Sequence, residues 1–366
     1  MSDKVFPPPA SASQNAHVSS LEQYRELYER SINDPDGFWT EQANRLVWEQ
    51  QWNTVREWDY NKAEIKWFIG GKINACYNCV DRHVDDGHGN DTALIWEGNN
   101  PDESRRFTYA ELQVEVKKAA NALKNIGVVK GDRICIYMQM IPELTIAMLA
   151  CARIGAVHSI VFGAFSADSL VTRINDSECK VIITQDTGVR GTKLDIPMKA
   201  NADKAVESTP SIEKILVVQR TGSEVEMDDG RDVWWHEALE SADAECPAEP
   251  MDAEDPLFIL YTSGSTGKPK GVLHTTGGYL TYVATTHHYI FDYHPGDVYW
   301  CTADIGWVTG HSYIVYGPMA NRAITMMFEG VPNYPDFGRF WQIVDKHNVN
   351  IFYTAPTALR ALMKEG

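Results

Sequence analysis

The sequence has no uninterrupted apolar stretch long enough to cross a membrane and no apolar segment near its start. Its longest apolar stretch, residues 144–165, is broken by Arg153, His158 and two glycines, whereas a spanning helix needs about 20 consecutive apolar residues. Residues 1–9 include charged residues and three prolines, and no apolar core of a secretory signal follows them. These absences argue against membrane insertion and export, and we expect a cytoplasmic protein.

Positive charge is also scarce. Lys and Arg number 33 against 50 Asp and Glu, which gives a formal net charge of −17. Nucleic-acid binding needs a clustered basic face that neutralises phosphates, and a strongly acidic, diffuse charge balance argues against one. A small anionic ligand remains compatible, because it needs only a local positive site.

Cysteines are few, seven in 366 residues, and irregularly spaced. Their odd number and the lack of an export signal favour reduced thiols. Cys76 and Cys79 form a Cys-x-x-Cys pair with His83 nearby, but a zinc site of this kind needs a second pair of ligands. We therefore expect no metal at these residues.

Further histidines lack the spacing of a His-Glu-x-x-His zinc motif, and we expect most of them to have structural roles: His274, His287, His288, His294 and His311. Asp292 and Asp297 lie close to a Pro-Gly pair and are expected to be turn residues.

Hydrophobic residues make up 44% of the chain and aromatic residues 11%, which is typical of a folded protein with one large or two moderate cores. The first 85 residues are rich in aromatic side chains. Ser20 and Gln23 are spaced as a capping pair before apolar residues at helical spacing. We predict a helical N-terminal lobe, residues 1–85, packed onto a larger domain, residues 86–366. An aromatic platform for a ligand is the alternative for the lobe.

From about Asp91 onward, short apolar runs alternate with helical patterns, which is typical of parallel βαβ units. The predicted strands cover residues 133–137, 157–162, 180–184, 214–218, 257–261, 298–301, 323–328 and 351–353. The predicted helices cover residues 109–126, 142–153, 166–175, 277–286 and 336–347, one segment between 301 and 323, and a last helix from Pro356. The acidic stretch 221–249 is predicted as a surface connection. The fold class is therefore α/β, with layers of mostly parallel sheet and flanking helices.

A loop rich in glycine and hydroxyl groups follows the predicted strand 257–261. Gly264 and Gly267 allow successive backbone N–H groups to face one point and hold an anion, and Lys268 and Lys270 add positive charge. Four hydroxyl side chains supply further donors: Thr262, Ser263, Ser265 and Thr266. Because α/β sheets place ligands at loops after buried strands, the pattern predicts a polyphosphate site. A flexible surface loop is the alternative.

The loop differs from two other motifs. A Walker A loop needs Gly five residues before its Gly-Lys glycine and Ser or Thr after the Lys, where this sequence has Thr262 and Pro269. A nucleophile elbow needs Gly at the position of Ser263.

Residues 262–271 resemble the signature phosphate loop of the AMP-binding, acyl-adenylate-forming superfamily. Residues 272–279, 304–318 and 328–335 are similar to its short-chain acyl-CoA synthetases, and to acetyl-CoA synthetases in particular. The likeness extends from about Gln23 to the last residue and includes residues 77–83. It implies an acetate–CoA ligase, in which acetate attacks the α-phosphate of MgATP and the thiol of coenzyme A displaces AMP from the acetyl-adenylate. ATP, Mg²⁺, coenzyme A and acetate are the implied cofactor and substrates, and a propionyl- or other short-chain acyl-CoA synthetase is the alternative.

The resemblance assigns Thr262 and Lys268 to catalysis and the ATP phosphates to Thr262, Ser263, Gly264, Ser265, Thr266, Gly267, Lys268 and Lys270. Mg²⁺ would bridge phosphate oxygens, so no protein metal ligand is expected. Trp307, Val308 and Thr309 offer a bulky wall, a small apolar wall and a hydroxyl, which suits a small acyl pocket. A core aromatic with its neighbours is the alternative.

The implied contacts of coenzyme A are Ala164, Arg190, Gly191, Thr192, Lys193, Thr309, Asn333 and Ala355. On charge alone, Arg190 and Lys193 could also belong to a solvated loop. Two residues depart from the family pattern. Ala164 replaces a glycine, and Lys193 replaces the more usual arginine, which removes a bidentate donor.

The family's adenine and ribose motifs, its second acyl-pocket tryptophan and its mobile C-terminal domain have no counterpart before Gly366. We therefore expect a truncated chain that needs this C-terminal domain as a partner and is inactive, or nearly so, without it. A nucleotide hydrolase with a variant phosphate loop and a non-catalytic nucleotide-binding module are the alternatives from other classes.

Overall fold

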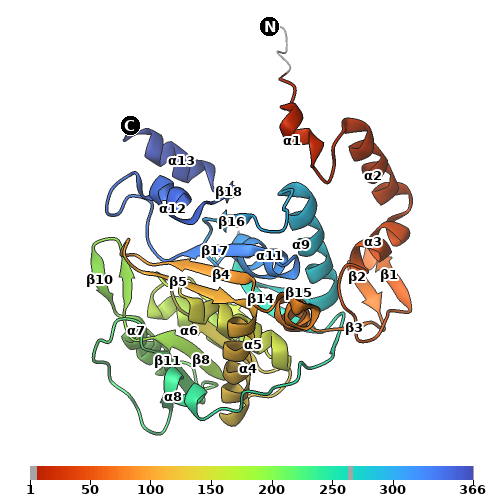
Figure 1. Ribbon diagram of the computed structural model, residues 1–366. Helices are drawn as coiled ribbons and strands as arrows, with labels where there is room; N and C mark the ends of the chain where they lie inside the picture. The colour runs from red at the N-terminus through yellow and green to blue at the C-terminus, as the bar shows by residue number, and fades with distance from the viewer. Residues whose placement is uncertain (1–5, 263–266, 366) are drawn as a thin grey trace.

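The computed structural model describes residues 6–262 and 267–365, which form two large sheets with helices on and between them (Figure 1). The first sheet contains β6 (Arg133–Tyr137), β7 (Val157–Ile160), β8 (Val181–Gln185), β11 (Lys214–Val218), β12 (Asp232–Trp234), β14 (Pro256–Thr262) and β15 (Lys270–Thr275), in the order β12-β11-β8-β6-β7-β14-β15. The second contains β4 (Thr92–Glu97), β5 (Ser104–Thr108), β16 (Val298–Cys301), β17 (Ile324–Phe328) and β18 (Ile351–Tyr353), in the order β18-β16-β17-β4-β5. Within these two large sheets, as far as the structure describes them, only the pairs β14–β15 and β4–β5 are antiparallel, which confirms the predicted α/β class with mostly parallel sheets.

Alternate side chains of the parallel strands face two different cores. Ile134 and Ile136 of β6 join the core that contains α4 (Tyr109–Asn125) and α5 (Pro142–Ile154). Cys135 and Tyr137 face the other way, toward α6 (Ala167–Ser177) and α7 (Met198–Val206). The far face of the second sheet packs against α12 (Arg339–His347) and α13 (Pro356–Met363). Both faces of each sheet are covered, as the unbroken apolar runs of the strands require.

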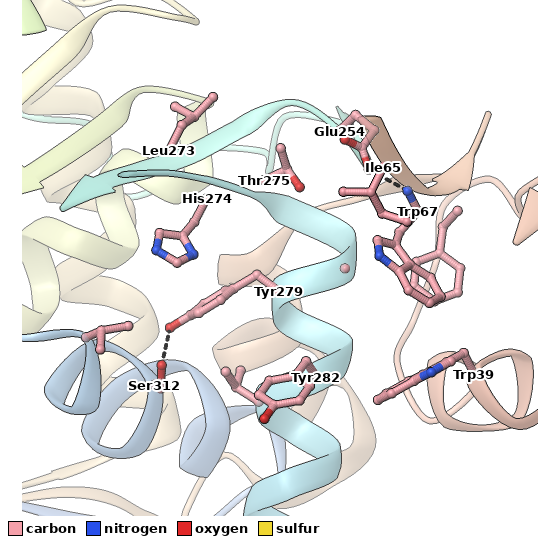
Figure 2. A pocket seen from close by; sticks show the side chains of 14 residues that line it. Trp39, Ile65, Trp67, Glu254, Leu273, His274, Thr275, Tyr279, Tyr282 and Ser312 are labelled. Atoms are coloured by element: carbon pink, nitrogen blue, oxygen red, sulfur yellow. Dashed lines mark hydrogen bonds between the residues drawn. The ribbon is translucent and has the colours of Figure 1, made fainter. Parts of the chain in front are cut away.

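The N-terminal part contributes α1 (Ala10–Gln14), α2 (Leu21–Asn33), α3 (Pro35–Ala43), β1 (Thr54–Asp59), β2 (Glu64–Ile69) and β3 (Lys72–Ile73). Part of its aromatic segment packs onto the larger body as predicted, although Trp58 is 60% exposed. Trp48 and Phe68 belong to the main core, while Trp39 and Trp67 face α9 (Thr276–Ile290) across a cavity of about 580 Å³ (Figure 2). In contrast, α2 buries no side chain.

The predicted helix start at Ser20 is confirmed, because its hydroxyl accepts the N–H of Gln23 at 3.1 Å. The Gln23 side chain bonds the backbone N–H of Ser19 instead of Ser20, so the pair is not a reciprocal capping box.

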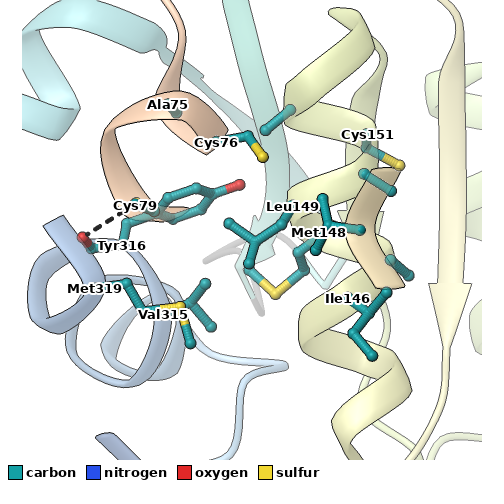
Figure 3. Close-up of a cluster of buried hydrophobic side chains, with 14 of the residues drawn as sticks. Ala75, Cys76, Cys79, Ile146, Met148, Leu149, Cys151, Val315, Tyr316 and Met319 are labelled. Carbon is teal, nitrogen blue, oxygen red and sulfur yellow. Dashed lines mark hydrogen bonds between the residues drawn. The ribbon is translucent and has the colours of Figure 1, made fainter. Parts of the chain in front are cut away.

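Helix α5 is buried on every side. Each of its residues except Glu143 is buried, and its side chains meet the segment that carries Cys76 and Cys79 on one flank and Tyr316 and Met319 on another (Figure 3). A helix that is apolar all round is stable only when other elements enclose it. Its enclosure between the two sheets explains the stretch 144–165 without a membrane. Within the described ranges, no helix combines the length and apolar character that spanning a bilayer requires.

Arg153, the one basic residue of α5, forms a buried ion pair. Two guanidinium nitrogens donate to the carboxylate of Asp81 at 2.7 and 3.0 Å, and a third donates to the carbonyl oxygen of Cys246. Both charged side chains are nearly inaccessible to water. The pair therefore joins three segments that are far apart in the sequence.

The prediction for residues 221–249 is wrong in part. Residues 232–234 form β12, which pairs in parallel with β11, and α8 (Trp235–Glu240) buries Trp235 and Leu239 in the main core. A three-residue edge strand is held by backbone hydrogen bonds, so it does not need the apolar run by which strands are recognised.

The remaining elements of the described residues are β9 (Gly188–Arg190), β10 (Lys193–Ile196), β13 (Met251–Asp252), α10 (Val308–Gly310) and α11 (Gly317–Ala320), with a 3-10 helix at Tyr60–Lys62 and π-helical segments at Tyr77–Asp81, Val84–His88 and His311–Tyr316. The predicted strands and helices are otherwise present, with bounds that differ by a few residues. All seven cysteines are buried and free, and burial raises the pKa of the Cys76 thiol to about 12.

The ion pair yields a stability prediction. Asp81→Ala leaves the Arg153 charge buried without a counter-ion, and we expect it to lower the free energy of unfolding by about 3–5 kcal/mol. The double variant Asp81→Ala/Arg153→Met removes both charges and should be more stable than the single variant. Urea unfolding followed by tryptophan fluorescence measures both.

Arg30→Ala is the control, because it removes an exposed pair with Glu41, and it should leave the unfolding midpoint unchanged. An Asp81→Ala protein with the midpoint of the parent would contradict the structural role of the buried pair.

Candidate functional site

A cavity of about 440 Å³ lies where strands of the two sheets end. Gln139 and Met140 follow β6, residues 162–164 follow β7, residues 302–304 follow β16, and residues 329–332 follow β17. Because the carboxyl ends of parallel strands meet at one edge, loops from both sheets contribute to one cavity. Such crevices are where open α/β sheets bind ligands.

The first sheet reverses its order beside β6. The chain passes from β6 to its neighbour β7 and then to β8 on the opposite side of β6. The space beyond β6 is therefore a topological switch point, and Gln139 lies in it. Its side-chain oxygen accepts the N–H of Val189 at 2.7 Å, and its own N–H donates to Gln185 at 2.8 Å. A Cβ at Gly163 would lie 3.1 Å from Gln139 Cγ, so glycine at 163 leaves room for this amide.

The cavity wall combines aromatic rings with two opposite charges. The Arg190 guanidinium lies 5.6 Å from the ring of Phe162, and the Trp307 ring lies 6.4 Å from Phe162. Asp304 accepts the N–H of Gly306 at 2.7 Å. Although Asp304 is partly open to the cavity, burial raises its pKa to about 6 against the lowering effects of this hydrogen bond and of Arg190. The wall suits a ligand with apolar and anionic parts.

The predicted phosphate loop is a hairpin between β14 and the antiparallel β15, in which Thr262 pairs with Lys270. Gly267 has φ +84°, which favours glycine, and Lys268 and Lys270 are exposed. Ser263, Gly264, Ser265 and Thr266 lie outside the described residues. Strand β15 was not predicted, because its residues were interpreted as loop and motif.

The register of the sheet places this hairpin beside the cavity. Phe258 of β14 pairs in parallel with His158 of β7. Thr262 and Phe162 each lie four residues further along, so both emerge at the same edge. Since Phe162 lines the cavity, the hairpin begins next to the cavity wall.

The three predicted acyl-pocket residues do not line one cavity. Trp307 lines the 440 Å³ cavity, Val308 lines the 580 Å³ cavity of Figure 2, and Thr309 lines neither. Trp307 is 52% and Val308 45% exposed, so the described residues do not enclose a small pocket around them.

Of the residues predicted to contact coenzyme A, Ala164 and Arg190 line the cavity. The lining does not include Gly191, Thr192, Lys193, Thr309, Asn333 or Ala355. Gly191 still lies close by, because its N–H donates to Asn99 at 2.6 Å and a Cβ on it would meet Val331, which lines the cavity.

Arg190 and Lys193 lie directly opposite each other in the hairpin β9–β10, and both are exposed. Like charges at directly opposite positions repel. An anion between them would relieve this repulsion, so the pair is suited to a phosphate-bearing ligand.

Sequence reasoning did not single out three polar residues of the cavity wall: Gln139, Asp304 and Glu329. Each follows the carboxyl end of a strand, and this position is the signal that could have identified them. Glu329 is buried and receives two hydrogen bonds from Arg220 at 2.9 and 2.8 Å. Burial raises the pKa of Glu329, and the Arg220 charge opposes that shift.

Comparisons with known proteins give the following matches. Residues 80–366 match the family described as AMP-binding enzyme, and residues 24–79 match the family described as acetyl-coenzyme A synthetase N-terminus. The chain is 61% identical over 364 residues to an acetyl-coenzyme A synthetase of Halorhodospira halophila, covering 99% of this chain and 56% of that protein. It is 60% identical over 368 residues to one of Magnetococcus marinus, covering 100% and 57%. Acetyl-coenzyme A synthetase 2 of Pseudomonas aeruginosa is 60% identical over 363 residues, with 99% and 56% covered. The chain thus spans little more than half the length of these curated relatives.

Asp304 yields a prediction about pH. Its pKa of about 6 in the folded protein exceeds that of an unfolded aspartate, about 3.9, so the ionised carboxylate destabilises the fold. This penalty is complete above pH 6 and fades as the pH falls toward 4. We expect Asp304→Asn, which keeps an acceptor for Gly306, to stabilise the chain by up to about 3 kcal/mol at pH 8 and by clearly less at pH 5.

Urea unfolding of parent and variant at both pH values measures the difference. A difference in stability that does not change with pH would show that Asp304 ionises normally.

Proposed function

The chain belongs to the AMP-binding enzyme family, and we propose that the whole protein is an acetate–CoA ligase that forms acetyl-CoA from acetate, ATP and coenzyme A through acetyl-adenylate. The named relatives at about 60% identity support this choice of acid. The observation that carries the proposal is geometric. The phosphate-loop hairpin and the cavity with Trp307 and Arg190 lie at the same edge of the sheet.

The charges near this edge fit the first step of the reaction. The acetate carboxylate and the ATP phosphates repel each other, so the site must neutralise negative charge and hold both reactants. In this proposal Lys268 and Lys270 supply that charge, and Thr262 and the loop N–H groups hold the β- and γ-phosphates. Trp307, Val308 and Thr309 form one part of an acetyl pocket that segments beyond residue 366 complete. Local cations are needed because the chain as a whole carries −17.

Mg²⁺ is the implied metal ion. Phosphate oxygens would be its main ligands, so the proposal assigns no side chain of this chain to the ion. When bound, the ion would neutralise phosphate charge. The protein contributes the hairpin that receives the metal-bound phosphates.

The second step brings in coenzyme A. We propose that its nucleotide lies against the pair Arg190 and Lys193 and that the rest of the molecule follows the cavity wall past Ala164 toward Trp307. Gly191, Thr192, Asn333 and Ala355 would complete the contacts outside the cavity lining. The aromatic wall of the cavity is compatible with the apolar parts of such a ligand.

We also propose the division into a lobe, residues 1–85, and an AMP-binding domain, residues 86–366. The two family matches adjoin at residues 79 and 80. Trp48 and Phe68 of the lobe share one core with α5, which supports a lobe that packs onto the domain.

The first test uses the protein expressed from its complete coding sequence. We expect acetate-dependent exchange of diphosphate into ATP, faster with acetate than with propionate or butyrate. Lys268→Ala should lower kcat/KM for ATP at least tenfold, because the variant loses a positive charge that stabilises the negatively charged phosphates. Lys62→Ala, which removes an exposed lysine distant in sequence from the hairpin, is the matched control and should have no effect.

Three outcomes would contradict the proposal. Faster exchange with propionate would indicate a propionyl-CoA synthetase. Phosphate release without any carboxylic acid would indicate a hydrolase. ATP binding without acyl-adenylate under any acid would indicate a non-catalytic module.

A second prediction concerns residues 1–366 alone. We expect this chain to give no acetate-dependent exchange above background. The resemblance assigns adenine binding, and a further catalytic lysine carried by the C-terminal domain, to segments beyond residue 366. Exchange at the rate of the complete protein would refute that requirement. The same assay, run on both proteins at equal concentration, measures it.

A further inference from the structure

Three histidines and an aspartate from distant parts of the sequence meet at the end of α9. His17 lies between α1 and α2, His288 lies in the last turn of α9, and Asp292 and His294 follow that helix. The His17 ring lies 4.5 Å from that of His294 and 3.7 Å from that of His288. One potential ligand atom each from His17, Asp292 and His294 lies within 4.8 Å of the other two.

Hydrogen bonds orient the groups of this cluster. The Nε2 atom of His17 lies 2.9 Å from the carbonyl oxygen of Tyr293. It can bond this oxygen only as a donor, so in the neutral ring Nδ1 is the nitrogen that carries the lone pair and would bind a metal ion. The backbone N–H of His17 donates to Asp292 Oδ1 at 2.8 Å, and Asp292 Oδ2 lies 3.5 Å from Nε2 of His294. Histidines that bind metals commonly donate their other ring N–H to a carbonyl in this way.

The turn after α9 brings Asp292 and His294 to His17. Asp292 has φ +49°, the left-handed conformation that commonly ends helices and that aspartate tolerates better than most residues. The chain reverses there, so the side chains of residues 292 and 294 face the same segment. The sequence pattern Asp-x-His alone does not reveal this arrangement, because the third group lies 275 residues away.

We propose that His17, Asp292 and His294 form a binding site for a divalent metal ion of the zinc type, which fastens the N-terminal segment to the end of α9. Two imidazole nitrogens and one carboxylate oxygen are a ligand set that zinc favours, with water in the fourth position. Ligand atoms around a tetrahedral zinc ion lie about 3.4 Å apart, so atoms that lie within 4.8 Å of one another must approach by up to about 1.4 Å. Neither large cavity includes these residues in its lining, so the proposal does not depend on the proposed function.

The fourth group, His288, is not part of the proposed ligand set. Arg45 lies 5.9 Å from the ring of Tyr289, and its charge disfavours a cation on that side. A metal ion is therefore expected on the side of Asp292.

A bound ion would restrain a part of the chain that is otherwise weakly held. Neither α1 nor α2 buries a side chain. His17 lies between them and bonds the turn after α9 twice. Closing this link with a metal should slow local opening of the segment and protect α2 from proteases.

The test uses the 366-residue chain, freed of metal with EDTA, and Zn²⁺ alone as the probe. Titration against a chromogenic chelator should give one equivalent bound at micromolar or lower concentration. His17→Ala, His294→Ala and Asp292→Asn should each weaken binding at least tenfold. Asp292→Asn is the matched variant, because asparagine also tolerates the left-handed turn and keeps an oxygen for the N–H of His17.

Two control variants locate the site. His288→Ala should change the affinity less than threefold, and His236→Ala, an exposed histidine outside the cluster, should not change it. Circular dichroism checks that each variant is folded. A second readout is trypsin cleavage at the exposed Arg25 of α2, which Zn²⁺ should slow in the parent and not in His294→Ala.

Two results would overturn the proposal. The first is the absence of stoichiometric zinc binding by the folded parent chain. The second is unchanged binding in both His17→Ala and His294→Ala, which would place the ion elsewhere.

Discussion

Helix α5 is buried between the two sheets, and this burial determines how the other elements are arranged around it. This helix has apolar side chains on all sides, so each sheet must present an apolar face to it. The enclosure also joins the sheets locally, because the Trp96 indole of β4 donates to the carbonyl oxygen of Met140, just before α5, at 2.9 Å. The strands of both sheets consequently end near one another, and the cavity lies between those ends.

The same enclosure makes the charge of Arg153 a structural element. A guanidinium buried in an apolar environment is stable only beside a counter-ion, because an unpaired buried charge is costly. Asp81 is the counter-ion of Arg153. Through that contact α5 holds the π-helical segment Tyr77–Asp81, near the end of the N-terminal lobe. Its bond to the carbonyl of Cys246 holds the connection after α8. The buried guanidinium of Arg153 therefore connects three segments that are not joined to one another by strand pairing.

Local positive charge in an acidic protein defines the candidate site. Arg190 and Lys193 lie opposite each other in the short hairpin β9–β10. Lys268 and Lys270 lie where β15 begins, after the end of β14. Two carboxyl groups in the cavity wall add little negative charge. Glu329 forms an ion pair with Arg220, and burial raises the pKa of Asp304, which favours its neutral form. The edge of the sheets is therefore locally less acidic than the chain as a whole, as the binding of ATP and coenzyme A would require.

Signals for local elements lie in neighbouring residues, because strand and helix periodicity and turn preferences depend on adjacent positions. These signals predicted most of the parallel strands, such as β6, β7 and β8, and the helix from Pro142, but they did not predict β4, β12 or β15. Which segments meet depends on the folding of the whole chain. β4 pairs with β17 across more than 200 residues, residues 232–234 join a sheet edge without an apolar run, and His17 meets Asp292. The pKa of Asp304 likewise depends on burial by distant segments. Periodicity reports which face of an element is buried, while the partner that buries it is selected by packing of the whole chain.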